Sequence, residues 1–156
     1  MIVLAENNIN AWKLKLIMKG RNIRILMIIL GLIGLGVSIY LFQDYFLKED
    51  GYLCEATSFF SCTLARDSPY SVLFGVPLGA WGALWFVMLL SFVYLSFKDR
   101  KWDLLILIWT IFGILFVTYF VRAEIIIKSL CPYCTITHLI VLICFVLAIL
   151  LYRKKH

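Results

Sequence analysis

Four long, uninterrupted apolar runs set the limits on what this chain can fold into. They cover residues 23–45, 72–97, 102–121 and 132–152. Each is longer than the roughly 18 residues that predict a membrane-spanning helix, and none alternates as the strands of a membrane β-barrel do. Because hydrocarbon offers the backbone no hydrogen-bond partners, such runs must satisfy their own peptide groups as helices. We therefore predict an all-α membrane protein, a bundle of four transmembrane helices.

Composition agrees with this prediction and removes whole classes of function. Of the 156 residues, 63% are hydrophobic and only 15% are charged, whereas soluble domains carry about 25% charged residues. So little polar surface would not cover a soluble globule, which excludes soluble enzymes, nucleic-acid binders and disordered tails. Residues 1–156 are expected to form a single integral membrane domain in contact with membrane lipid.

The basic residues predict how this domain is oriented. Most of the 15 lysines and arginines lie at the start of the first run, between the second and third runs, or after the fourth. The positive-inside rule then places both termini in the cytoplasm of a multi-pass protein of the plasma membrane. Residues 46–71, between helices one and two, become an extracytoplasmic loop, and the link 122–130 also faces outward. The net charge of +6 thus reports topology, and no nucleic-acid partner is expected.

Four of the five cysteines fall on the predicted outward side. Cys54 and Cys62 lie in the first loop, and Cys131 and Cys134 belong to a Cys-Pro-Tyr-Cys sequence where the fourth run begins. Outside the cytoplasm thiols can be held as disulfides, so both pairs could be structural disulfides that only stabilise loops. This interpretation stays open for Cys54 and Cys62. It is weaker for Cys131 and Cys134, because a disulfide that closes over two residues constrains little of the unfolded chain.

The C-x-x-C spacing at the start of a helix instead favours redox chemistry. Residues three apart share a helix face, and Pro132 suits the first helical turn, which places Cys131 at or near the N-cap. Free backbone N–H groups and the positive end of the helix dipole stabilise a thiolate there, and the thiolate is the form that attacks a disulfide. We expect Cys131 to be the more exposed sulfur and Cys134 to lie deeper.

A four-cysteine zinc site is the alternative for this set, and we do not expect a metal. Structural zinc sites pair C-x₂₋₄-C units, whereas Cys54 and Cys62 form a C-x₇-C pair. Cys144 lies within the fourth run, where a thiol acts as a small hydrophobe, and we assign it no role. Trp81, Trp85 and Trp109 are expected to pack in the bundle or to anchor it at the interface.

The order of these features resembles the vitamin K epoxide reductase family. The features are the loop pair Cys54 and Cys62, the following Ser68, a Phe-Gly-Val-Pro entry to the second run, and C-x-x-C opening the last run. The resemblance covers roughly the first run to the last and is strongest to prokaryotic members, many of which carry a fused thioredoxin-like domain. This chain stops at His156, so the resemblance implies the single-domain form and a separate thioredoxin-like partner that acts as disulfide donor.

The resemblance also implies an activity, that of a quinone-dependent thiol oxidoreductase supporting disulfide-bond formation. Electrons would pass from the partner to Cys54 and Cys62, then to Cys131 and Cys134, and finally to a membrane quinone such as ubiquinone or menaquinone. Ser68 stands at the loop serine/threonine position of the family, and a plain loop cap is an equally good interpretation of it.

His138 marks a departure from the animal members of this family. They carry a tyrosine one turn after the second active cysteine, where it hydrogen-bonds the quinone. Here His138 would donate to a quinone carbonyl or shuttle its proton, or simply bond to the helix backbone. The asparagine that those enzymes place near the start of the second span also has no obvious counterpart. Both departures favour simple quinone reduction, with reduction of vitamin K quinone or its epoxide as the alternative task.

Two other classes of protein compete with this interpretation. A structural or transport protein would use its disulfides only to hold loops, but the runs contain almost no ionisable groups to line an ion path. A second type of quinone-linked disulfide oxidase carries C-x-x-C in its first outward loop and the widely spaced pair in its second. The order here is the reverse, so we rank that class below the vitamin K epoxide reductase type.

Overall fold

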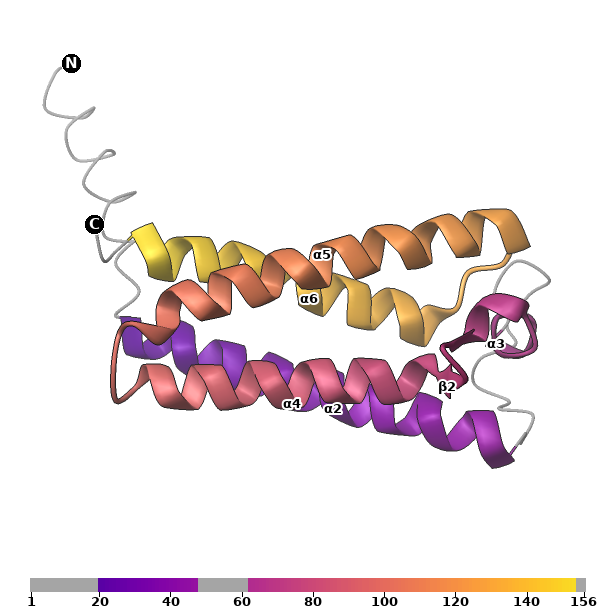
Figure 1. Cartoon of the computed structure of the whole chain (residues 1–156), viewed down its shortest axis with the longest axis horizontal. Coiled ribbons are helices and arrows are strands. Elements are labelled where there is room, and N and C mark those ends of the chain that lie inside the picture. The colour runs from indigo at the N-terminus through magenta and orange to yellow at the C-terminus, as the bar shows by residue number, and fades with distance from the viewer. Residues whose placement is uncertain (1–19, 48–61, 154–156) are drawn as a thin grey trace, which may run out of the picture.

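Four long helices dominate the computed structural model, which describes residues 20–47 and 62–153. They are α2 (Gly20–Leu47), α4 (Leu78–Ser96), α5 (Trp102–Ile127) and α6 (Pro132–Arg153). Within the described residues, these four are the helices long and apolar enough to cross a membrane, which confirms the predicted all-α membrane fold. Helix α2 packs on α4 and α6, and α5 packs on the same two helices (Figure 1).

The second helix begins later than the sequence predicts, because residues 72–77 form a hairpin instead of its first turns. Strands β1 (Val72–Leu73) and β2 (Val76–Pro77) pair antiparallel. Phe74 and Gly75 between them have φ values of 54° and 79°, and two positive values are what a two-residue type I′ turn requires. The predicted start at residue 72 is therefore wrong, and the helix starts at Leu78, directly after Pro77. The third helix also differs, since α5 continues six residues beyond the predicted end at 121.

Helices α2 and α4 approach each other through small residues. A Cβ atom added to Gly79 would lie 2.5 Å from the backbone nitrogen of Phe42, and one added to Gly34 would overlap the Phe86 ring. Glycine is needed at both positions because the partner atoms occupy the space of any side chain. Without a hydrophobic force between helices in lipid, such close packing is a main source of their association.

A buried ion cluster joins three helices at one end of the bundle. The Arg24 guanidinium of α2 donates to both carboxylate oxygens of Asp103 on α5, at 3.0 and 3.1 Å, and to the Ser96 hydroxyl of α4 at 2.6 Å. The Ser96 hydroxyl in turn donates to Asp103. Asp103 is fully buried, so its charge is compensated within this cluster rather than by water.

The other end of the bundle carries the short elements. Helix α3 (Cys62–Arg66), the 3₁₀ turn η1 (Pro69–Ser71) and the hairpin lie beside the link between α5 and α6 (Figure 1). The hairpin is fastened to α4 by the Trp81 indole, whose Nε1–H donates to the carbonyl oxygen of Leu73 at 3.1 Å. This arrangement places residues 62–77 over the start of α6, where the C-x-x-C sequence lies.

Candidate active site

Cys131 stands at the N-terminus of α6, as the sequence predicts. Its carbonyl oxygen accepts the first helical hydrogen bond, from the Thr135 N–H at 2.9 Å, and its sulfur accepts the Cys134 N–H at 3.4 Å. The Cys134 thiol, followed by the backbone N–H groups of Cys134 and Tyr133, lowers the pKa of Cys131 below its ordinary value. Burial and the nearby charge of Glu124 act in the opposite direction but do not cancel the shift. Cys131 therefore ionises more readily than an ordinary cysteine.

The expectation that Cys131 is the more exposed sulfur is wrong. Cys131 is 1% exposed, whereas Cys134 is partly exposed. The reason is the position of α3, whose first residue brings the Cys62 sulfur to 3.3 Å from that of Cys131. Cys62 is disulfide-bonded, while Cys131 and Cys134 are free thiols. Cys54, the other predicted site cysteine, lies outside the described residues.

An ion pair and a hydroxyl hold α3 in this place. Arg66 of α3 pairs with Asp44 of α2 at 3.6 Å, and both side chains are largely buried. The Ser68 hydroxyl donates to the carbonyl oxygen of Ala65 at 2.8 Å, and the Ser68 carbonyl accepts the Ser71 hydroxyl at the same distance. Ser68 therefore binds its own loop next to the sulfur atoms, which agrees with the loop-cap interpretation of this residue.

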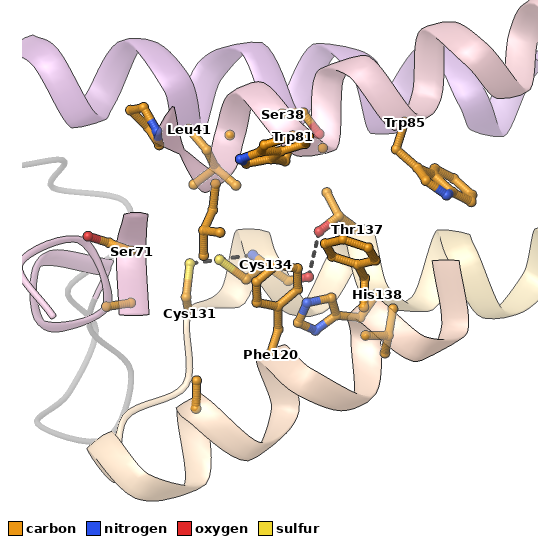
Figure 2. A pocket seen from close by; sticks show the side chains of 18 of the residues that line it. Ser38, Leu41, Ser71, Trp81, Trp85, Phe120, Cys131, Cys134, Thr137 and His138 are labelled. Atoms are coloured by element: carbon orange, nitrogen blue, oxygen red, sulfur yellow. Dashed lines mark hydrogen bonds between the residues drawn. The ribbon is translucent and has the colours of Figure 1, made fainter. Parts of the chain in front are cut away.

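A cavity of about 290 Å³ lies directly beside the sulfur atoms and is lined mainly by apolar side chains. This volume is near the lower end of the roughly 300–1,000 Å³ of small-molecule sites. Trp81 and Trp85 of α4 face Phe120, Cys134 and His138 across it (Figure 2). Cys62, Cys131 and Ser68 also belong to its wall. The structure thus brings five of the six predicted site residues to one cavity.

His138 lies one turn beyond Cys134 and stacks on the Phe120 ring, with 6.1 Å between centroids and 6° between planes (Figure 2). The neighbouring Thr137 hydroxyl donates to the Cys134 carbonyl oxygen at 2.7 Å. Stacking holds the plane of the imidazole at the cavity wall.

Three wall residues were not predicted as part of the site. Trp81 and Trp85 were expected only to pack or to anchor, yet both line the cavity, and the Trp85 indole Nε1 is buried without a hydrogen-bond partner among the described residues. Glu124 of α5 also lines it, 8% exposed. A glutamate seven residues before the C-x-x-C pair, just after the third apolar run, was the sequence signal for this residue. Cys144 is buried in the bundle core, away from the cavity.

A helical bundle that places a C-x-x-C pair beside an apolar cavity is an arrangement suited to a membrane oxidoreductase. The family model for the vitamin K epoxide reductase family matches residues 25–149, and the chain belongs to this family. The predicted resemblance is confirmed, and family membership makes the chain an oxidoreductase. A search of curated proteins found no match. Among residues 20–47 and 62–153, no group of three or more potential metal ligands occurs.

Proposed function

We propose that this chain is a quinone-dependent thiol oxidoreductase that reoxidises a separate, extracytoplasmic thioredoxin-like protein and so supports disulfide-bond formation. The observation that carries the proposal is the 3.3 Å approach of the Cys62 and Cys131 sulfur atoms at the edge of the cavity. Thiol–disulfide exchange proceeds by attack of one sulfur on another through a mixed disulfide. Two sulfurs at this distance need only a small displacement to exchange.

The proposed electron path begins at the dithiol of the partner, which reduces a disulfide between Cys54 and Cys62. Cys62 then attacks Cys131 of the oxidised C-x-x-C pair, so that a Cys62–Cys131 bond forms and the Cys131–Cys134 bond breaks. Cys54 displaces Cys131 from Cys62, which restores the loop disulfide and leaves Cys131 and Cys134 reduced. Their reoxidation to a disulfide releases two electrons and two protons, and the quinone takes up both as it becomes hydroquinone.

Two further observations support this path. A disulfide-bonded Cys62 beside free Cys131 and Cys134 is the combination that follows the exchange step and precedes quinone reduction. The lowered pKa of Cys131 suits a sulfur that must act as leaving group and as nucleophile, because both roles are easier for a thiolate of low pKa near ambient pH.

The cavity supports a quinone as the acceptor. A quinone head group is a flat ring with two carbonyl oxygens, which suits aromatic walls with a few polar groups. We assign the His138 side chain to one quinone carbonyl, because it faces the cavity beside Cys134 (Figure 2). We assign Ser68 a role in stabilising the loop and not in binding the quinone, because its hydroxyl already donates to the carbonyl oxygen of Ala65.

The distribution of basic residues supports the orientation. The start of α2, the link between α4 and α5 and the end of α6 lie at the end of the bundle opposite to α3 and the hairpin (Figure 1). These segments carry the basic residues Arg21, Arg24, Lys98, Lys101 and Arg153. By the positive-inside rule this end is cytoplasmic, so the termini lie in the cytoplasm and the redox end faces outward. After reduction of the loop disulfide, a membrane-impermeant thiol reagent should then label the loop cysteines in intact cells, and labelling in broken cells alone would reverse the orientation.

The proposal is tested by the reduction of short-chain ubiquinone and menaquinone analogues by purified protein and a reduced thioredoxin-like protein. Loss of a residue that forms the covalent intermediate lowers turnover by orders of magnitude, and we expect at least about 10³-fold for Cys134→Ser. Cys144→Ala, which removes the core thiol outside the cavity, is the matched control and should keep turnover within about threefold. Turnover that survives Cys134→Ser would overturn the proposal.

A further inference from the structure

Glu124 is an acidic side chain beside the C-x-x-C pair that the proposed electron path does not use. It lies in the last turn of α5, is 8% exposed and lines the cavity with Cys131 and Cys134. Its Oε1 atom is buried and has no hydrogen-bond partner among the described residues. An unpartnered buried carboxylate oxygen destabilises a fold, so a carboxyl group kept in this place calls for a chemical reason.

The end of α5 is shaped so that this carboxyl group meets Cys131. Lys128 adopts the left-handed conformation with φ 56°, which is unusual for a residue with a side chain. The Ser129 N–H then donates to the Glu124 carbonyl oxygen, and the Lys128 N–H to that of Ile125, both at 3.3 Å. The chain turns back at once, and the backbone N–H of Cys131 acts as a donor to the Glu124 carboxyl group.

No cation neutralises Glu124 among the described residues. The charged and titratable groups that line the same cavity come from α6 (Cys131, Cys134 and His138), from α3 (Cys62 and Arg66), from η1 (Tyr70) and from α2 (Asp44 and Tyr45). Arg66 is paired with Asp44, and Arg122 and Lys128 on α5 itself are exposed. The negative charges of Glu124 and Cys131 oppose each other, so one of the two groups is ionised in the reduced site and not both, whereas Glu124 beside an uncharged disulfide can ionise.

We propose that Glu124 holds the proton that Cys131 gives up and delivers it to the quinone. The inference rests on the proposed function. In the reduced site Cys131 is a thiolate, Cys134 a thiol and Glu124 a neutral acid. When the quinone is reduced, the Cys131–Cys134 bond forms and two electrons leave the sulfurs. One proton passes from the Cys134 thiol and the other from the Glu124 carboxyl group to the two quinone oxygens. The site then holds a disulfide and a carboxylate, so its net charge is unchanged.

This role distinguishes Glu124 from a merely structural residue, because it sets how many protons accompany the electrons. Reduction of the wild-type C-x-x-C pair should take up two protons per two electrons near neutral pH, one on Cys134 and one shared by Cys131 and Glu124. In Glu124→Gln the shared site is lost, and Cys131 ionises without a neighbouring negative charge. That variant should take up one proton per two electrons.

The experiment measures the reduction potential of the C-x-x-C pair in purified protein between pH 6 and 8. Redox buffers of defined thiol/disulfide ratio set the potential, and alkylation after acid denaturation counts the reduced thiols. The expected slope of potential against pH in Glu124→Gln is half that of the wild type. Glu124→Asp, which keeps a carboxyl group, should restore the wild-type slope, and Arg122→Gln at the exposed side of the same turn should not change it. Equal slopes in wild type and Glu124→Gln would overturn the proposal.

Quinone reduction gives a second, independent readout. General acid catalysis contributes about 10²–10⁴-fold, and Glu124→Gln should therefore lower quinone turnover by about 100-fold while electron transfer from Cys62 to Cys131 persists. A loss of both steps together would indicate a structural defect and count against the role. If the wild type reduces no quinone, the proposed function fails, yet the potential measurement still decides the proton-holding role of Glu124.

Discussion

The buried acidic side chains at the two ends of the bundle differ in whether their carboxylate oxygens have hydrogen-bond partners. At one end Asp103 is enclosed but receives hydrogen bonds from Arg24 and Ser96. At the other end Glu124 is enclosed beside Cys131, and its Oε1 has no partner among the described residues. A satisfied buried cluster fixes the arrangement of helices, whereas unsatisfied polar atoms are retained where a ligand or a proton has to be received. The contrast separates the end that holds the bundle together from the end that reacts.

The largest effect should come from breaking the satisfied end. Asp103→Asn removes one charge and leaves Arg24 buried without its partner, and breaking such a pair costs about 3–5 kcal/mol. Denaturant unfolding in detergent measures this loss. Asp99→Asn, which removes the exposed pair with Lys101, is the control and should change the free energy of unfolding by at most about 1 kcal/mol. Folded Asp103→Asn protein that reduces quinone more slowly would show that the two ends are coupled.

A smaller effect is expected from loosening α3 at the reactive end. Asp44→Asn weakens the largely buried pair with Arg66, so Cys62 would spend less time near Cys131. We expect about a tenfold slower transfer between Cys62 and Cys131, equivalent to about 1.4 kcal/mol, measured by rapid acid quench and thiol alkylation. The matched control is Asp67→Asn, because Asp67 also pairs with Arg66 but is exposed. If Asp44→Asn and Asp67→Asn slowed the transfer between Cys62 and Cys131 equally, the positioning role of Asp44 would be contradicted.

Two stacked tryptophans allow the same comparison within the cavity wall. The Trp109 indole Nε1–H donates to the Trp85 carbonyl oxygen at 3.1 Å, whereas the Trp85 indole has no partner among the described residues. Trp109→Phe should therefore lower the free energy of unfolding by about 1 kcal/mol. Trp85→Phe should leave stability nearly unchanged and raise the KM for quinone several-fold with little effect on kcat, because the lost donor faces the ligand. A reversed pattern in these two variants would contradict this division.

The smallest effect concerns the pH dependence of Cys131. Its pKa is lowered first by the hydrogen bond from the Cys134 thiol, so its thiolate persists to lower pH than an ordinary cysteine thiolate does. Cys134→Ser keeps a donor at this position and Cys134→Ala does not. The pH midpoint for attack of Cys131 on the Cys62 disulfide should lie lower in the serine variant, because exchange is lost only as the pH falls through the pKa of Cys131. Identical midpoints would mean that the thiol donor does not act.

Local patterns were enough to predict the helices and the cysteines. The apolar runs predicted four helices because lipid permits no other backbone solution, and the C-x-x-C spacing placed Cys131 at a helix N-terminus. The hairpin at residues 72–77 was missed because its apolar residues continue the hydropathy of the following helix. The type I′ turn depends on a positive φ at Phe74, a residue type that seldom adopts it.

The parts of the site that were missed depend on contacts between distant segments. Cys131 was expected to be exposed, and only the placement of α3 shows that Cys62 covers it. Glu124 was not predicted as a site residue, and its burial depends on the turn at Lys128. Trp85 could not be distinguished from tryptophans that only pack in the bundle, because the sequence does not show which indole N–H lacks a hydrogen-bond acceptor.

The central claim is that Cys62 and Cys131 exchange directly, and disulfide trapping in Cys134→Ala tests it most directly. Without Cys134 the C-x-x-C disulfide cannot form, so the Cys131 thiolate is left to attack the loop disulfide at Cys62, and the released Cys54 is the thiol that can reverse this step. The protein is oxidised, quenched with acid, alkylated and mapped by mass spectrometry of its peptides. We predict an intramolecular Cys62–Cys131 disulfide as the main linked species. A map in which Cys131 remains a free thiol, or is joined to Cys54 instead, would contradict the account.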